Sequence, residues 1–467
     1  MGRRRFWWIA LGLVAGLSTV GWARSNDSGM SIASAASDSG KTAQKSAEDK
    51  KIAAAEDGAD LEVKELRFDK LEARLRTMPA GAERDYFAGV LANATGQITE
   101  SIRLLNSALP LLRTSRPDRA AVALEDLADD YNKSFRYDDA ARADDDLLTH
   151  FSGQLRPEEL QGAKDDAGVM QILREAPAQT ITWDGAVRLK TERNPLNSMN
   201  VDLAVNGVRG PWLLDTGANL SVVSRSFAER LGLKLLPGTA QTTAGLTGIE
   251  NPLRVALLPT LQMGGGTLHN VVVMVLNDPN LNISLGKSTY QINGIIGYPV
   301  FQALGTITFL RDGEFAAGDK TQAPVVGARM FMNGLTPIIE CKVEGTDLPF
   351  SFDTGASDTD FLLRYYQRFH SESGSWKKAK NKTGGAGGTV KQKVYVQPQI
   401  NLGIGDKTVS LKNVPIHTSG TGSNNAEVYG NLGQDVVANF ESFTLDFTTM
   451  TFSLGKLLAP DKANPKQ

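Results

Sequence analysis

The tetrapeptide Asp-Thr-Gly-Ala occurs twice in this chain, at residues 215–218 and again at residues 353–356. Each copy follows a short apolar run, as a turn after a buried strand would. One copy alone would be ordinary turn chemistry, because Asp and Gly both favour turns. Two copies make acid–base chemistry possible, because two carboxyl groups held close together share one proton. The ionised member can then activate a water while the protonated member polarises a carbonyl. The repeat therefore indicates paired acid–base chemistry by Asp215 and Asp353.

The residues around the two copies keep the same spacing, which indicates a tandem duplication of one lobe. Asp215 and Asp353 lie 138 residues apart, and the other landmarks repeat at offsets between 136 and 139. The matched pairs are Gly207 with Gly345, Pro211 with Pro349, Gly245 with Gly384, Gly264 with Gly403, Gly297 with Gly433, and Phe309 with Phe447. Both halves of the paired chemistry therefore lie in one chain.

Both lobes consist of short alternating or apolar runs punctuated by Gly, Asn and Pro, a pattern typical of β-strands. Helical spacing is brief and follows each tetrapeptide, at residues 224–231 and 361–369. The sequence therefore predicts a multidomain chain with a mainly β, bilobal part of two pseudo-symmetric lobes, 177–320 and 321–458, and a short tail, 459–467. The clearest predicted strands are residues 199–205, 271–276, 306–310, 330–343, 394–402 and 443–447.

From about residue 198 to residue 455 the chain resembles the pepsin and retropepsin superfamily of aspartic proteases, and it is nearest the bacterial proteins with retropepsin-like lobes. The shared features are an apolar strand before Asp-Thr-Gly-Ala, a Gly-rich hairpin after it, and a later segment of two apolar residues and Gly. That segment reads Ile-Ile-Gly-Tyr at 295–298 in lobe one and Asn-Leu-Gly-Gln-Asp at 431–435 in lobe two. Two departures stand out. The first hairpin has no Tyr to act as a pepsin-type flap tyrosine, and Asn431 stands where lobe one has Ile295.

The resemblance implies an aspartic endopeptidase that hydrolyses peptide bonds with a water activated by Asp215 and Asp353, without a metal or other cofactor. The expected partner is a peptide or protein substrate. Retroviral members build this site from two identical chains, whereas one chain supplies both halves here, so the catalytic unit is expected to act as a monomer. The rival hypothesis is a catalytically inactive scaffold that binds peptides or proteins, because Asp-Thr-Gly can remain as a fold-locking turn after activity is lost.

The other residues of the repeat are expected to support the two aspartates. By the resemblance, Thr216 and Thr354 hydrogen-bond across the lobe interface and lock the two loops together. Gly217 and Gly355 let the backbone approach the carboxyl groups closely, which a Cβ would hinder. The Gly-rich hairpins would be mobile covers that pair with an extended substrate. The remaining expected site residues are Ala218 and Ala356 in the loops, and Gly245, Thr247, Gly248, Gly385, Ala386 and Gly387 in the hairpins.

Other kinds of chemistry find little support in the sequence. The four histidines, His150, His269, His370 and His417, lie at no ligand spacing, so neither a metal site nor a Ser-His-Asp triad is expected. No phosphate-binding Gly-Lys-Ser/Thr loop occurs, and a formal net charge of −2 gives no reason to expect binding to nucleic acid.

The negative charges of Asp358 and Asp360 could raise the proton affinity of the Asp215–Asp353 pair, but solvated loop or helix N-cap positions are the preferred interpretation for both residues. The one cysteine, Cys341, excludes an intramolecular disulfide and is expected to be buried.

Residues 1–23 have the pattern of an export signal. Three arginines at positions 3–5 precede an apolar stretch at 6–20, and Gly21-Trp22-Ala23 offers small residues for cleavage before Arg24. The expected location is therefore the periplasm or the outside of the cell. An uncleaved membrane anchor is the alternative, and the match to a twin-arginine signal is incomplete. The polar stretch that follows has no cysteine, which excludes a lipid anchor through a lipobox.

Residues 24–60 are rich in Ser, Ala, Asp and Lys and are predicted to be a disordered linker. Residues 61–176 have helical spacing. Strand-like alternation begins near residues 179–182, where the chain could be cut into separate domains. A helical domain is therefore predicted ahead of lobe one.

Two helix pairs in this domain, at residues 86–108 and 122–148, resemble tetratricopeptide repeats. Their matching positions, Gly89 with Ala128 and Ser101 with Ala140, are 39 residues apart, the usual period plus a short insertion. An unrelated helical hairpin bundle fits the pattern about as well. If the repeats are real, the domain is expected to present a surface for a protein partner or for the substrate.

Overall fold

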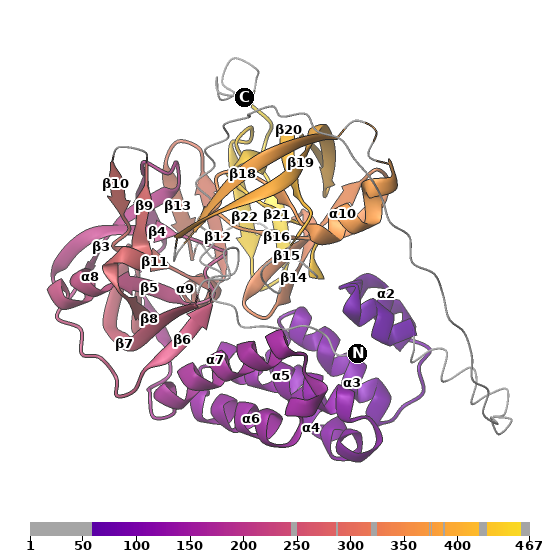
Figure 1. The fold of residues 1–467 in the computed structure, drawn as a ribbon. Coiled ribbons are helices and arrows are strands. Elements are labelled where there is room, and N and C mark those ends of the chain that lie inside the picture. Colours follow the sequence, from indigo (N-terminus) through magenta and orange to yellow (C-terminus); the bar gives the residue numbers. More distant parts are fainter. Residues whose placement is uncertain are drawn as a thin grey trace, which may run out of the picture.

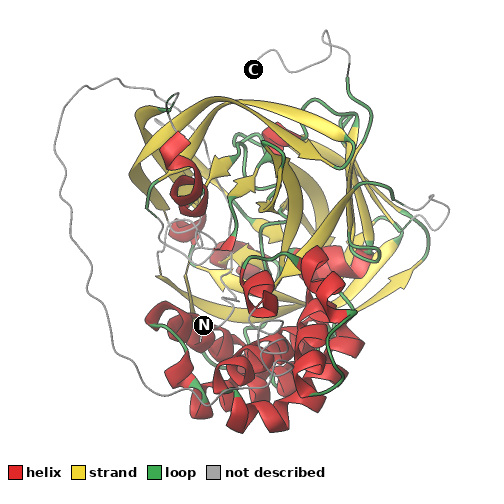
Figure 2. Ribbon diagram, turned by 90° about the vertical axis from the view of Figure 1, so that its right-hand side faces the viewer, coloured by secondary structure: helices red, strands yellow, loops and turns green. Residues whose placement is uncertain are grey.

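The computed structural model describes residues 58–243, 250–285, 288–318, 325–372, 374, 376–385, 388–419 and 427–458. A layer of helices, residues 58–173, lies below a larger β-rich part (Figure 1). Figure 2 shows the same separation from the side, with only short helices among the strands. The predicted order of a helical region followed by a β-rich region is therefore confirmed. The predicted export signal and tail, and most of the predicted linker, lie outside the described residues.

The helical layer begins earlier than the sequence suggests. Residues 58–64 are helical, so residues 58–60 belong to this layer and not to the predicted linker. Within the described residues, no helix combines the length and apolarity needed to cross a bilayer. The labelled helices are α2 (Phe68–Leu75), α3 (Ala82–Ala94), α4 (Ile98–Ser115), α5 (Pro117–Lys133), α6 (Tyr137–His150), η1 (Ser152–Gln154) and α7 (Pro157–Leu173).

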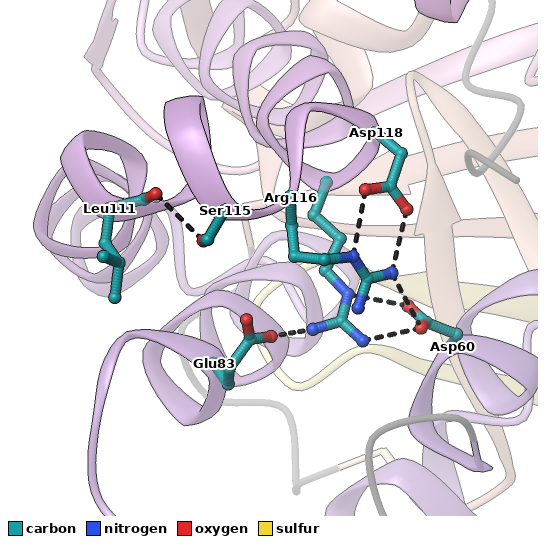
Figure 3. Close-up of polar contacts among 7 residues, drawn as sticks. Asp60, Glu83, Leu111, Ser115, Arg116 and Asp118 are labelled. Atoms are coloured by element: carbon teal, nitrogen blue, oxygen red, sulfur yellow. Dashed lines mark hydrogen bonds and ion pairs between the residues drawn. The ribbon is translucent and has the colours of Figure 1, made fainter. Parts of the chain in front are cut away.

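An ion-pair network holds the first described helical residues to α3 and α5 (Figure 3). Arg119, at the start of α5, is buried and pairs with both Asp60, at 2.7 Å, and Glu83 of α3. Its guanidinium lies 4.7 Å from the ring centre of Phe87. Arg116 pairs with Asp118 and reaches the same Asp60 carboxylate. A buried arginine must be paired to be tolerated, so these carboxylates join three helices at one point.

The two predicted helix pairs correspond to α3 with α4 and to α5 with α6. Small residues let the first pair approach closely. A Cβ on Gly89 would lie 2.7 Å from the Leu105 side chain, and the Ser101 hydroxyl donates a 2.9 Å hydrogen bond to the Gly89 carbonyl. The helix pairing therefore agrees with the prediction, while a relationship to tetratricopeptide repeats stays a prediction.

The β-rich part contains two consecutive groups of strands. The first comprises β1 (Thr180–Trp183), β2 (Val187–Arg193), β3 (Met199–Val205), β4 (Val208–Leu214), β5 (Ser221–Ser224), α8 (Arg225–Arg230), β6 (Ala240–Thr243), β7 (Glu250–Met263), β8 (Gly266–Leu276), η2 (Asp278–Leu281), β9 (Asn282–Ser284), β10 (Thr289–Gln291), β11 (Gly294–Ile296), α9 (Tyr298–Leu304), β12 (Thr306–Leu310) and β13 (Glu314–Ala317). The second comprises β14 (Ala328–Asn333), β15 (Thr336–Val343), β16 (Thr346–Phe352), β17 (Asp360–Phe361), α10 (Leu363–Phe369), η3 (His370–Glu372), β18 (Lys377–Gly385), β19 (Gly388–Ile404), β20 (Lys407–His417), β21 (Gly430–Leu432), η4 (Gln434–Val436), β22 (Ser442–Asp446) and β23 (Thr451–Leu454).

Most of the predicted elements occur, with one correction. Strands β3 and β12 have the predicted bounds, and α8 and α10 lie within the predicted helices. The single strand predicted for residues 330–343 is wrong, because the chain reverses there as the β14–β15 hairpin. Gly334 has φ 58°, a left-handed turn conformation that glycine adopts at little cost.

The two groups of strands pair in the same local way around the aspartates. Strand β11 is parallel to β4 and antiparallel to β5, and β21 is parallel to β16 and antiparallel to β17. A sheet in the order β2-β13-β12-β22-β23-β14 joins the two groups. At its centre, Phe309 of β12 stacks on Phe443 of β22 with ring centroids 4.6 Å apart. The two groups are thus held together by backbone hydrogen bonds and by a shared core.

The helical layer packs against both groups of strands. Tyr137 and Leu173 belong to the same buried apolar cluster as the strands of the first group. On the second group, Phe68 of α2 lies against Phe331 of β14, with ring centroids 4.8 Å apart. Beside them Arg329 pairs with Glu72 at 2.9 Å. The helices therefore cover apolar surface on both groups and do not form a separate body.

Candidate active site

Asp215 and Asp353 each stand directly after a strand, β4 and β16, at the point where the chain turns away. The backbone N–H of Asp215 donates to the carbonyl of Ile296 at 3.1 Å, and that of Asp353 donates to the carbonyl of Leu432 at 3.0 Å. Each aspartate loop is therefore held by the strand that runs parallel to its own, β11 in one case and β21 in the other.

The two loops are bonded to each other through their threonines, all within the interior. The N–H of Thr216 donates to the hydroxyl of Thr354, and the N–H of Thr354 donates to the hydroxyl of Thr216, both at 3.0 Å. Each hydroxyl donates in turn to the opposite strand, Thr216 to the Phe352 carbonyl and Thr354 to the Leu214 carbonyl. These four bonds fix the distance and the orientation between the two aspartate loops.

The carboxyl groups of Asp215 and Asp353 are buried and in contact. Their exposed fractions are 0% and 3%, and the interaction between the two carboxyl groups raises the pKa of Asp215. A Cβ on Gly217 would lie 2.5 Å from the Asp353 carboxyl carbon, so only glycine fits at that position. Asp215 Oδ1 accepts from the Gly217 N–H at 2.9 Å, and Asp353 Oδ1 accepts from the Gly355 N–H at 2.7 Å. The geometry of the loops therefore forces the two carboxyl groups together.

This arrangement raises the proton affinity of the pair. Burial, followed by the neighbouring Asp353 carboxylate, raises the pKa of Asp215 well above its ordinary value. Burial raises the pKa of Asp353 to about 6, although hydrogen bonds from Asp215, the loop N–H groups and Asn431 oppose the shift. Two carboxyl groups in contact cannot both ionise cheaply, so the pair holds one proton over a broad pH range.

Several polar residues around the loops were not predicted as site residues. The Nδ2 of Asn431 lies 3.4 Å from Asp353 Oδ2, and Gln434 Nε2 donates to the Thr354 carbonyl at 2.8 Å. From the other group of strands, the Ser198 hydroxyl contacts the Gly355 carbonyl at 3.4 Å. Asn431 and Gln434 could have been found in the sequence, because both lie in the segment 431–435 that matches 295–298 of lobe one. Ser198 has no comparable signal.

The predicted substrate-binding hairpins are only partly described. Gly245, Thr247, Gly248, Ala386 and Gly387 lie outside the described residues, while Gly385 ends β18 and pairs with Gly388 of β19. The supporting residues Ala218 and Ala356 are buried in the loops. Ala356 also donates its N–H to Asp353 Oδ1 at 3.1 Å.

The expectation that Asp360 is solvated is wrong, whereas Asp358 is exposed. Strand β17 lies between β20 and β21, so Asp360 is buried, with its Oδ1 3.2 Å from His417 Nε2. His417 Nδ1 in turn lies 2.8 Å from Gln392 Oε1.

Cys341 is buried, as expected. Among the described residues, no three His, Cys, Asp or Glu side chains are grouped so as to hold a metal ion.

Comparison with known proteins gives one family match. Residues 201–300, which include Asp215, match the model of the family described as aspartyl protease. Among solved structures, a retropepsin-like aspartic protease from Rickettsia conorii is 17% identical, with 30% of this chain and 92% of that chain covered and a TM-score of 0.21. The N-terminal part of the bacterial S-layer protein SbsC is 10% identical, with coverages of 79% and 73% and a TM-score of 0.13. No curated protein matches the chain. The family match therefore supports the aspartic protease superfamily, and it covers the loop that supplies the first half of the site.

Proposed function

We propose that this protein is an aspartic endopeptidase whose catalytic residues are Asp215 and Asp353. The proposal rests on one observation above all, the buried contact between these two carboxyl groups, held by reciprocal threonine hydrogen bonds. The aspartyl protease match over residues 201–300 supports the same class of reaction. The matched spacing of the two Asp-Thr-Gly-Ala copies supports a tandem origin of two lobes.

The chemistry follows from one shared proton. A water between the carboxyl groups gives a proton to the ionised aspartate as its oxygen bonds to the peptide carbonyl carbon, and the protonated aspartate gives its proton to the carbonyl oxygen. When the C–N bond breaks, the leaving nitrogen takes the proton from the aspartate that received it from the water. One hydroxyl of the tetrahedral intermediate gives its proton to the other aspartate as the carbonyl re-forms, so the pair again holds one proton. No covalent intermediate with the protein is required.

The substrate class follows from the surroundings of the Asp215–Asp353 pair, called the dyad below. The hairpin strands β6–β7 and β18–β19 flank the two Gly-rich segments of the sequence, and their extended backbone is of the kind that a peptide pairs with by strand addition. A peptide or an unfolded protein segment is therefore the proposed substrate. Since one chain supplies both aspartates, the proposed unit is a monomer, located in the periplasm or outside the cell and insensitive to chelators. The tetratricopeptide-like helical layer is proposed as a second contact for a protein.

The test is cleavage of denatured casein by the purified chain across a series of pH values, with and without a pepstatin-type inhibitor and with and without EDTA. Inhibitable, EDTA-resistant cleavage whose specific rate does not fall on dilution is the expected result. Inhibitor binding without cleavage at any pH would instead favour the inactive peptide-binding scaffold. Loss of activity with EDTA, or on dilution, would contradict the metal-free, monomeric site.

A further inference from the structure

The surroundings of the two aspartates differ in polarity at one matched pair of positions. Beside Asp215, strands β4 and β11 pair Leu213 with Ile295, and both side chains are buried. Beside Asp353, strands β16 and β21 pair Ser351 with Asn431, which occupy the matching positions of the repeat. A polar pair therefore stands next to one aspartate, and an apolar pair stands next to the other.

The Asn431 amide is oriented by contacts on both of its sides. Its Oδ1 accepts a 2.7 Å hydrogen bond from the Ser351 hydroxyl, and its Nδ2 lies 3.4 Å from Asp353 Oδ2. In this orientation the amide nitrogen faces Asp353 and the amide oxygen faces Ser351. Asn431 is therefore a donor to the Asp353 carboxylate.

The backbone does not create this difference between the two aspartates. Each carboxyl group accepts hydrogen bonds from the N–H groups two and three residues further along its own loop, those of Gly217 and Ala218 for Asp215 and those of Gly355 and Ala356 for Asp353. The side-chain donor beside Asp353 has no counterpart in the Leu213–Ile295 pair, because neither of those side chains has a polar atom.

We propose that Asn431 is a positioning residue that places the negative charge of the pair on Asp353 and leaves the shared proton on Asp215. The inference rests on the proposed function above and assigns a role to each aspartate in it. An N–H donor stabilises a carboxylate, whereas apolar neighbours stabilise the neutral acid. The pKa directions agree, since the pKa of Asp215 is raised well above its ordinary value, while Asn431 is among the groups that lower that of Asp353. Asp353 then accepts the proton of the attacking water, and Asp215 protonates the carbonyl oxygen.

The other ionisable groups near Asn431 have partners of their own. Asp360 lies opposite Asn431 across β17 and β21 and pairs with His417. Asp435, on the η4 helix, accepts hydrogen bonds from the N–H and hydroxyl of Thr359. Asp358, in the loop before β17, is exposed. Burial raises the pKa of Asp435 to about 7, and desolvation also raises the pKa of Asp358, so the titrations of Asp215 and Asp353 must be distinguished from those of these two groups.

The direct test is carboxyl titration of the full chain, labelled with ¹³C at the aspartate carboxyl carbons. Asp215→Asn and Asp353→Asn variants identify the two resonances by their disappearance. The expected result is that Asp353 ionises in the first step and that Asp215 keeps its proton to higher pH. Ionisation of Asp215 first, or equal sharing, would overturn the inference. This measurement needs no turnover, so a wild-type chain that cleaves nothing would refute the proposed function and leave the charge assignment to be decided by the titration.

A kinetic test uses variants at the matched positions. Asn431→Leu removes the donor at nearly constant size, and the acid limb of the kcat/KM profile on a short peptide should move up by about one pH unit, a tenfold loss on the acid side. Should this variant fail to fold, the double variant Ser351→Leu/Asn431→Ile copies the pair that lobe one already packs. The reciprocal variant, Ile295→Asn, brings a donor to Asp215 and should reduce the preference for charge on Asp353. An unmoved acid limb in a folded variant at position 431 would contradict the proposal.

Discussion

The backbone N–H of Thr216 and the hydroxyl of Thr354 form a hydrogen bond of 3.0 Å, and exchanging the two residues gives the second bond at the same length. The relationship is local and symmetric, although 138 residues separate the two threonines in the sequence. Each hydroxyl acts both as acceptor and as donor, so its removal breaks two bonds at once. This feature is the most direct point at which to test how the loops hold the dyad.

Replacing Thr216 by Val, or Thr354 by Val, keeps the shape of the side chain and leaves a buried N–H of the opposite loop without its acceptor. Each variant should lose about 1–3 kcal/mol of unfolding free energy, the cost of an unsatisfied buried donor. Peptide cleavage should fall more steeply than stability, because the carboxyl groups lose their alignment. Urea denaturation and kcat measure the two effects. Thr308→Val, in the half-buried Thr308–Thr444 pair of the central sheet, is the control and should leave kcat unchanged.

Asp215→Asn and Asp353→Asn should each abolish turnover while the chain still folds. The loss in kcat/KM is expected to be at least about 10²-fold, the lower end for removal of a positioned acid–base group. The repeat makes neither aspartate redundant, so the two variants should behave alike within the detection limit. Cleavage assays at matched folded concentration, judged by circular dichroism, measure this. Wild-type turnover in either variant would show that the dyad is assigned wrongly.

Asp144, buried within α6, should make the chain less stable at neutral pH than in mild acid. Burial, with a smaller contribution from Asp145, raises the pKa of Asp144 well above the ordinary 3.8. Its stabilising contribution is therefore complete below the unfolded value and is lost as the pH rises through the folded value. Asp144→Asn should increase the unfolding free energy at neutral pH by about 1 kcal/mol or more, one pKa unit being worth about 1.4 kcal/mol.

The measurement for Asp144 is urea denaturation of both chains across the acid range, where the difference should shrink toward low pH. Asp202→Asn is the control, since Asp202 is exposed, pairs with Arg209 at 3.0 Å and lies on β3, away from α6. A pair of this kind contributes little at the surface, so this control should change stability only slightly. A gain from Asp144→Asn that is the same at every pH would exclude ionisation as its cause.

Removing the helical layer should prevent the rest of the chain from folding, although the change of pattern near residues 179–182 suggests a separable unit. A chain that starts at Ala176 exposes the apolar surfaces that Leu173 and Phe68 cover, and it should be insoluble. In the full chain, Phe68→Ala should cost about 3–5 kcal/mol, as large aromatic deletions in cores do. Leu111→Ala, at a position 56% exposed, is the control and should stay within about 0.5 kcal/mol. A truncated chain that is soluble and active would contradict this prediction and show that the β-rich part folds without the helical layer.

The closeness of Asp215 and Asp353 could be predicted from the sequence, because both residues lie in a short repeated motif; their catalytic role stays a proposal. Two copies of the motif at a matched spacing were enough to identify Asp215 and Asp353. The apolar runs before them were enough to predict the strands that precede each aspartate. The departure at Asn431 was also visible, but its contact with Asp353 depends on the parallel pairing of β16 with β21, which brings residues about 80 positions apart together.

The incorrect expectations have the same physical origin. Asp360 was expected in solvent, because a short polar segment after a turn gives no sign that β17 will lie between β20 and β21. The contact between Phe68 and Phe331 could not be predicted either, since the sequence of an apolar helix face does not indicate which surface of the protein will pack against it. Local pattern identified the elements, and long-range pairing decided their neighbours.

The Ser351–Asn431 pair has a consequence for how such a site can change over generations. When two identical chains build a site, every substitution appears on both sides of the axis, so an advantage on one side is inherited together with its cost on the other. A chain that contains both halves is free of this constraint. Here the pair beside Asp353 is polar, while the pair beside Asp215 is apolar. If the proposed duplication produced the two halves, selection could then act on each half of the site separately.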